Sequence, residues 1–389
     1  YVDSSEAAEH WDVYASMFGG IPTAEIDEMS EFWTAFPALK KALFTESGIP
    51  YVNVSTPDIK SAIKSHPDVV GFEKAFNAAF STFPAFLKEE LIDRMGSIEI
   101  SKAETVLSAD IFERLKDIPL IDKYAAFQLL DDDWTGISID LEMLQTEGFA
   151  ATKKVDPNLV IKKKDGKDQE VQEGWVGHII PFDLVQATLL SAETDELHGL
   201  ESRLAEIPSE YESILDEMTE EDKESCNDVL TDEGDAFVPK EVSKKIKEMK
   251  KDRSPESIAL RTLLEKVESL VKNEKEIKAE IKAKGAALQA KTKDTIESLS
   301  DEQALDLLEK KWIAPLIESI HKLPDTVIDS LVSKIQALQN KYATTFFEVE
   351  QQISETEATL SGMIDDLEGN EYDMLGLNEL KKLLGGSAE

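Results

Sequence analysis

Five histidines and one cysteine are the residues of this chain best suited to metal binding or nucleophilic catalysis. The histidines are His10, His66, His178, His198 and His321. No two of them stand at the i,i+4 spacing, and the chain has no Cys-x-x-Cys, so no metal site is predicted. Cys226 lies in an acidic segment, which raises a thiol pKa, so it is a poor nucleophile.

Glycine-rich and carboxylate motifs are equally uninformative about catalysis. The pairs Gly19-Gly20 and Gly385-Gly386 lack a flanking strand and helix, and no phosphate-binding or nucleophile-elbow motif occurs. The run Asp131-Asp132-Asp133 could bind a cation, but adjacent carboxylates point in different directions, so we expect a solvated helix end. We therefore predict no catalytic, cofactor-binding or metal-ligating residue.

Composition indicates an acidic protein with real hydrophobic cores. The 389 residues are 41% hydrophobic with a formal net charge of −37, and length alone suggests two or three domains. One cysteine fits a reducing cytoplasm, where we place the protein, and no apolar run reaches the length of a membrane span.

Basic residues are concentrated in two places. The first is residues 240–293, with a charge balance of +7, which follow acidic residues 186–239 with a balance of −15. The second is the patch "ATKKVDPNLVIKKKDGK", which contains Lys162, Lys163 and Lys164. These lysines are either the tip of a solvated hairpin or a contact to DNA phosphates within a larger assembly.

The elements that must position these residues are mainly α-helical. Residues 1–134 predict a helical region with a break at Pro37, and helices around 101–115 and 121–130. Residues 135–185 change period: "TGISIDLEMLQTEGF" is rich in β-branched residues, and "NLVIKKKDGKDQEVQEGW" is typical of a hairpin. We predict a small β element at about 150–180.

Residues 186–299 predict a long antiparallel coiled-coil hairpin. Steps of three and four from Leu190 to Met218 place apolar residues at eight of nine positions, and from Leu260 to Leu288 at seven of nine. A polar bend joins the two arms, and Pro208 should kink the first. The opposite charge balance of the arms favours their pairing with each other.

Residues 300–368 predict C-terminal helices that dock a partner. The first carries Pro315 inside it, and the last has a stripe that needs an apolar cover. The predicted partner-docking residues on this stripe are Phe346, Val349, Ile353, Leu360, Met363 and Leu367. Residues 369–389 form a tail that we expect to fray or to dock weakly.

Several blocks resemble the C-terminal part of the modification (DNA methyltransferase) subunit of type I restriction-modification systems. They appear in the family's order and extend to about residue 368. The blocks are "GGIPTAEIDEMSEFWTAFPALKKALF" (19–44), "DIKSAIKSHPDVVGFEKAF" (58–76), "GWVGHIIPFDLV" (174–185), "KKWIAPLIESIH" (310–321) and "YATTFFEVEQQISETEATL" (342–360).

The resemblance implies that the chemistry lies outside this chain. In the family, a preceding domain binds S-adenosylmethionine at a glycine-rich motif and flips adenine onto Asn-Pro-Pro-Phe. This chain has neither motif, and its nearest string, Asp156-Pro157-Asn158, lacks the second Pro and the aromatic. Tyr1-Val2-Asp3 matches the run that follows the family's catalytic motifs, and there is no initiating Met, so we expect a fragment.

We expect an assembly region that docks the catalytic domain to the specificity subunit for adenine-N6 methylation. The resemblance implies specificity and restriction subunits as partners and DNA through the assembled complex. S-adenosylmethionine would be the cofactor of the parent subunit, with none in this fragment. The alternative is a free-standing acidic helical scaffold that binds another protein through its coiled-coil hairpin. An independent enzyme is the least favoured of the three classes.

Overall fold

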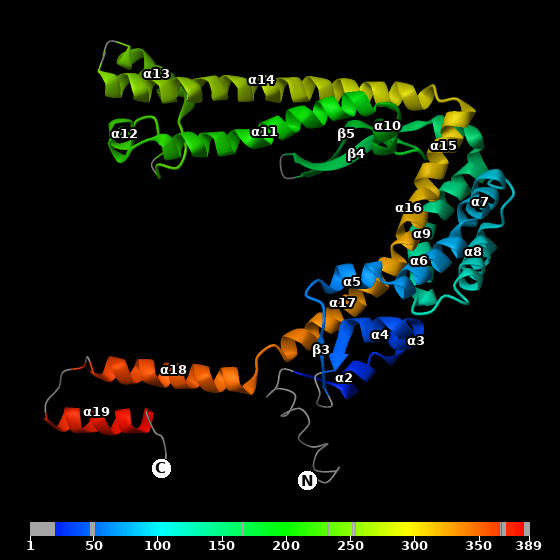
Figure 1. Cartoon of the computed structure of the whole chain (residues 1–389). Helices are drawn as coiled ribbons and strands as arrows, with labels where there is room; N and C mark the ends of the chain where they lie inside the picture. The colour runs from blue at the N-terminus through cyan, green and yellow to red at the C-terminus, as the bar shows by residue number, and fades with distance from the viewer. Residues whose placement is uncertain are drawn as a thin grey trace, which may run out of the picture. The chain divides into compact units, whose positions relative to one another are not determined.

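The computed structural model describes residues 20–46, 51–164, 167–231, 233–250, 252, 254–365, 367 and 371–384. The predicted features Tyr1-Val2-Asp3, His10 and Gly385-Gly386 lie outside these residues, as does Gly19 of the first glycine pair. The chain is mainly helical, as expected, with small antiparallel sheets (Figure 1). No described helix combines the length and apolar character that a bilayer crossing requires.

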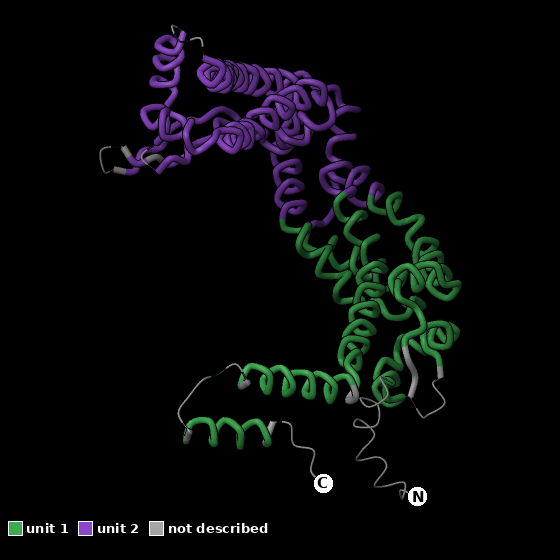
Figure 2. The backbone as a smooth tube through the Cα atoms, turned by 60° about the vertical axis from the view of Figure 1, so that its left-hand side comes forward, with its two compact units in different colours: residues 1–87, 101–135, 315–389 green, residues 88–100, 136–314 purple. Residues whose placement is uncertain are grey.

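The chain forms two compact units, each assembled from separate stretches of sequence (Figure 2). Unit 1 comprises Tyr1–Leu87, Ser101–Thr135 and Pro315–Glu389; unit 2 comprises Lys88–Ile100 and Gly136–Ala314. The predicted segment 1–134 thus contributes to both units, and the C-terminal helices group with most of it. The boundaries of the five segments predicted from the sequence (1–134, 135–185, 186–299, 300–368 and 369–389) stay a prediction.

Unit 1 is a set of helices around a small sheet. Its helices are α2 (Thr23–Asp27), α3 (Ser30–Ala35), α4 (Pro37–Leu43), α5 (Ile59–Ser65), α6 (Pro67–Phe80), α7 (Phe83–Leu87), α8 (Ile100–Arg114), the first half of α9 (Lys123–Glu147), most of α16 (Ala314–His321), α17 (Leu323–Lys341), α18 (Phe346–Asp365) and α19 (Glu371–Leu384). Strands β1 (Ile21–Pro22), β3 (Tyr51–Val54) and β2 (Phe44–Glu46) form an antiparallel sheet in that order. The sequence analysis missed this sheet because its strands are two to four residues long.

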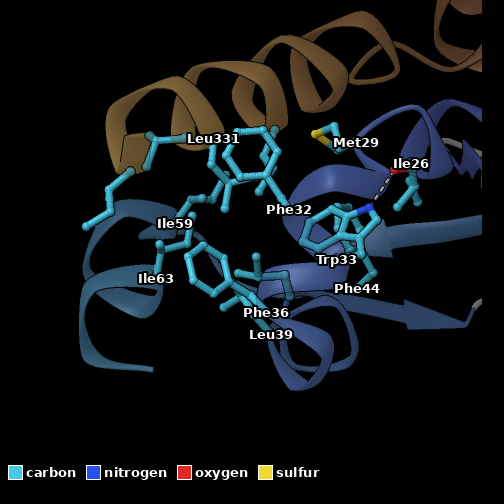
Figure 3. Packing of buried hydrophobic residues seen from close by; sticks show 14 of the residues in the cluster. Ile26, Met29, Phe32, Trp33, Phe36, Leu39, Phe44, Ile59, Ile63 and Leu331 are labelled. Atoms are coloured by element: carbon cyan, nitrogen blue, oxygen red, sulfur yellow. Dashed lines mark hydrogen bonds between the residues drawn. The ribbon is translucent and has the colours of Figure 1, made fainter. Parts of the chain in front are cut away.

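The core of unit 1 joins residues that are far apart in the sequence (Figure 3). Phe32, Phe36 and Ile63 pack in one buried cluster with Leu331 and Ile335 of α17. The Trp33 indole N–H donates to the Ile26 carbonyl at 2.6 Å, which satisfies its polar atom inside the core. As predicted, Pro37 interrupts the first helical block and occupies the first turn of α4.

Unit 2 contains the longest helices and the two-stranded sheet. It comprises η1 (Lys88–Asp93), the second half of α9, η2 (Phe149–Lys153), β4 (Val155–Lys164), β5 (Lys167–Gly177), α10 (Phe182–Leu189), α11 (Ser191–Glu217), α12 (Glu220–Ser225), α13 (Pro239–Met249), α14 (Pro255–Glu297) and α15 (Asp301–Trp312). Strands β4 and β5 pair antiparallel, which confirms the small β element at about 150–180.

Helices α11 and α14 lie side by side and run in opposite directions (Figure 1). Glu193 at the start of α11 pairs with Lys291 near the end of α14, and Glu217 at the end of α11 pairs with Lys266 near the start of α14. At the far end, Ile214 and Met218 join the segment that follows α12, helix α13 and the start of α14 in a buried cluster. Helix α11 continues through Pro208 as one helix.

Three expectations from the sequence are wrong. Residues 135–147 are not β-rich but continue α9, because Trp134, Ile137, Leu141 and Leu144 follow helical spacing and are buried. Asp131-Asp132-Asp133 therefore lie inside a helix and not at its end. Pro315 is not inside one helix, since α15 ends at Trp312 and α16 starts at Ala314.

The predicted tail is also more regular than expected. Residues 371–384 form α19, although the sequence analysis expected residues 369–389 to fray or dock weakly. The apolar residues Met374, Leu377 and Leu380 in this stretch recur in steps of three, which places them on one helical side.

Candidate docking surface

Residues suited to catalysis are dispersed in the structure. His66 accepts from the Asp68 backbone N–H at the start of α6, His321 meets the edge of Phe76, and His198 is exposed on α11. Among the described residues, no group of three His, Cys, Asp or Glu side chains is placed to hold a metal ion. The structure brings none of these histidines together.

Cys226 is fully buried beside α12. Burial raises the pKa of its thiol, and the nearby carboxylates of Asp228 and Asp222 act in the same direction. This agrees with the expectation from its acidic sequence. The same segment borders a hollow of about 500 Å³ that includes Asp222, Ser225 and Lys245. Lys245 is already engaged there by Asp228 and by the Ser225 carbonyl.

His178 is the most strongly engaged histidine. Its Nδ1 lies 2.6 Å from the Asp156 carboxylate of β4, and its Nε2 lies 3.1 Å from the Glu147 carboxylate at the end of α9. The hydrogen bond with Asp156, reinforced by Glu147, raises the pKa of His178. The ring therefore ties the base of the β4–β5 hairpin to α9, which is a structural role.

Asp140 is the one buried carboxylate among the described residues, and it too has a structural role. It accepts from the Trp312 indole N–H at 2.7 Å and from the Lys311 ammonium. Lys311 also donates to the Ile179 carbonyl at 2.7 Å. These bonds attach α15 to α9 within unit 2, and they satisfy the polar groups of the "KKW" block.

The predicted docking stripe lies on the exposed surface of α18. Val349, Ile353, Leu360 and Met363 are 42%, 54%, 43% and 62% exposed, and Leu367, just beyond the helix, is 51% exposed. The side chain of Phe346 lies outside what the structure describes. The 3-4 spacing of these positions places them on one side of the helix.

Helix α17 of the same chain has an apolar stripe that is covered, which allows a comparison with α18. Its apolar residues Ile328, Leu331, Val332 and Ile335 are all at most 5% exposed, because α5 and the unit 1 core cover them. The α18 stripe has the same spacing but lacks such a cover among the described residues. The exposed stripe is therefore a candidate docking surface.

Local interactions fix the start of α18. The Thr345 backbone N–H donates to the Glu348 carboxylate at 2.8 Å, and the Glu348 backbone N–H donates to the Thr345 hydroxyl at 3.2 Å. This reciprocal pair is a capping box. It sets the helix start, and hence the side on which the stripe lies, without help from a partner.

Helix α19 lies beside α18 and extends the surface (Figure 1). Ile364 of α18 and Met374 and Leu377 of α19 are half-buried, whereas Leu375 and Leu380 are 60% and 46% exposed. Sequence reasoning left α19 out of the docking surface. The signal that could have included it is the spacing of its leucines.

The predicted DNA-contacting lysines lie at the end of β4. Lys163 is exposed and is opposite Asp168 of β5 in register, whereas the side chains of Lys162 and Lys164 lie outside what the structure describes. Oppositely charged cross-strand neighbours attract each other, so Asp168 competes with any phosphate for Lys163.

Comparisons with known proteins give no relative. No protein-family model, no curated protein and no solved structure matches this chain.

Proposed function

We propose that this chain is the C-terminal assembly region of the methylation subunit of a type I restriction-modification system. In this role it docks the catalytic domain to the specificity subunit for adenine-N6 methylation of DNA. The observation that carries the proposal is the exposed stripe of α18, since an amphipathic helix with an uncovered stripe is suited to completing a helical bundle with a partner. The ordered sequence blocks that resemble the family support the same assignment.

We further propose that α11 and α14 form an antiparallel coiled-coil hairpin that spaces the docking parts of the complex. Ion pairs from Glu193–Lys291 to Glu217–Lys266 support this arrangement, as does the burial of Ile207 and Ile277 between the ends of the pair. Charged residues flanking a coiled-coil seam set partner choice and orientation. Here the carboxylates of acidic α11 and the lysines of α14 favour pairing of the two helices with each other.

Cofactor, restriction subunit and DNA belong to the assembled complex under this proposal. The chain has no glycine-rich cofactor motif and no Asn-Pro-Pro-Phe, so S-adenosylmethionine does not fit its residues, and we assign no catalytic step to them. Lys163, with Lys162 and Lys164, adds at most a few phosphate contacts once the complex has formed on DNA in the cytoplasm.

Co-expression with the specificity subunit encoded beside this chain tests the proposal. We expect a stable complex, and we expect Ile353→Glu and Leu360→Glu to weaken it at least about tenfold, because each places a charge in the apolar contact. Ala358→Glu is the matched control, since Ala358 is an exposed residue of the same helix on its opposite side. Circular dichroism checks that all three variants fold.

Two outcomes would contradict the proposal. One is that the wild-type chain and the specificity subunit elute separately. The other is that Ala358→Glu disrupts the complex as strongly as the two stripe variants. In the first case the acidic scaffold, which binds a different protein through α11 and α14, becomes the better account.

A further inference from the structure

The α18 surface is acidic on a helix that has no basic residue of its own. Residues 346–367 contain six acidic residues and no Lys or Arg. Glu350 and Glu357 are seven residues apart, next to the apolar stripe on one side, where flanking charges of paired helices meet. Within the described part of the chain, neither of them forms an ion pair.

The same chain contains a covered stripe that is flanked by carboxylates. Asp325 and Asp329 flank the buried stripe of α17, and they pair with Lys64 and Lys60 of α5 at 2.6 and 2.8 Å. Between these pairs, Ile63 of α5 meets the α17 stripe in the unit 1 core. The two carboxylates beside this covered stripe thus face lysines of the covering helix α5.

The pair of long helices, α11 and α14, shows the same pairing of carboxylates with lysines. Glu196 of α11 pairs with Lys284 of α14, and Glu217 pairs with Lys266, with Ile207 and Ile277 buried between the ends. In both cases, carboxylates beside a covered apolar stripe pair with lysines of the covering helix. Helix α18 has carboxylates beside an exposed stripe, and no lysine-bearing element covers that stripe among the described residues.

From these observations we infer that the partner element on α18 is an amphipathic helix with Lys or Arg beside its apolar stripe. This inference rests on the proposed docking role of α18 and adds the chemistry of the partner. Its length is set by α18, whose 20 residues span about 30 Å, so the partner helix needs about five to six turns. A second copy of α18 is disfavoured because it would bring acidic flanks together.

Two synthetic 21-residue helical peptides test the inference against the full chain. Both carry the same Leu/Ile stripe, and they differ only in having Lys or Glu at the flanking positions. Fluorescence anisotropy at low ionic strength should show the Lys peptide binding about tenfold tighter than the Glu peptide, with the difference shrinking as salt is added.

Charge reversal on α18 provides a more stringent test of the inference. In the double variant Glu350→Lys/Glu357→Lys, the Glu peptide should become the tighter ligand. Ile353→Glu should abolish binding of the Lys peptide, whereas Ala358→Glu should leave it unchanged. Equal binding of both peptides to the wild-type chain, or an unchanged preference in the double variant, would overturn the inference. So would self-association of the chain that Ile353→Glu abolishes, since a second copy would then occupy the stripe.

The two proposals fail separately. If the specificity subunit binds but the double variant does not change the peptide preference, the docking role survives and the partner chemistry is wrong. If the Lys peptide is preferred but the specificity subunit does not bind, α18 still takes a basic helix, and the assignment to a type I complex is wrong.

Discussion

At the scale of single residues, the polar groups that look chemically capable are occupied by structural contacts. His178 is held by Asp156 and Glu147, and Asp140 accepts from Trp312 and Lys311. The sequence predicts no metal site from histidine spacing, because ligand spacing on one helix is a local property. It could not predict these partners, since they come from distant segments. The Asp131-Asp132-Asp133 prediction failed for a local reason, because the helix continues past them.

His178 makes part of the stability of unit 2 depend on pH. Its folded-state pKa is raised, so its contribution is present in full below the pKa of the unfolded chain, about 6.5. It is lost as pH rises through the higher folded-state pKa. We expect His178→Gln to lower stability by about 1 kcal/mol at pH 5.5 and by much less at pH 8.5.

Thermal unfolding at the two pH values measures this difference. His198→Gln is the matched control, because His198 is exposed on α11 and should give the same small effect at both pH values. A loss for His178→Gln that is equal at pH 5.5 and pH 8.5 would show that protonation of the ring does not strengthen its two carboxylate bonds.

At the scale of elements, repeated apolar spacing predicted the long helices well. Leu190, Ile207, Ile214 and Met218 of the first seam are buried, as are Leu260 and Leu288 of the second. Short or composite elements were not predictable in this way. Strand β1 has two residues, and α9 carries β-branched residues on a helix that tertiary burial stabilises.

The pairing of α11 with α14 gives an element-scale prediction. Ile207 is 1% exposed, so Ile207→Ala should leave a cavity and cost about 2–4 kcal/mol. Urea unfolding followed by the helical circular dichroism signal measures the loss. Ser209→Ala, two residues away and exposed, should change the midpoint little. Equal midpoints for the two variants would mean that the α11 seam is not a packed contact.

At the scale of the whole molecule, each unit is built from segments that are distant in sequence. Helix α17 completes the core that Phe32, Phe36 and Ile63 begin, some 270–300 residues earlier in the chain. The sequence indicates that each stripe needs a cover, but not which segment supplies it, because several helices have compatible spacing. For α17, the segment that covers the stripe in the structure is α5. For α18 the cover is the partner that we propose.

Amide hydrogen exchange of the full chain, with and without the specificity subunit, tests the docking claim most directly. We predict that the subunit slows exchange in residues 346–365, because a covered α18 opens less often, and leaves α11 unchanged. Slowed exchange confined to α11 and α14, with α18 unaffected, would contradict the account and would favour a scaffold that binds through its long helices.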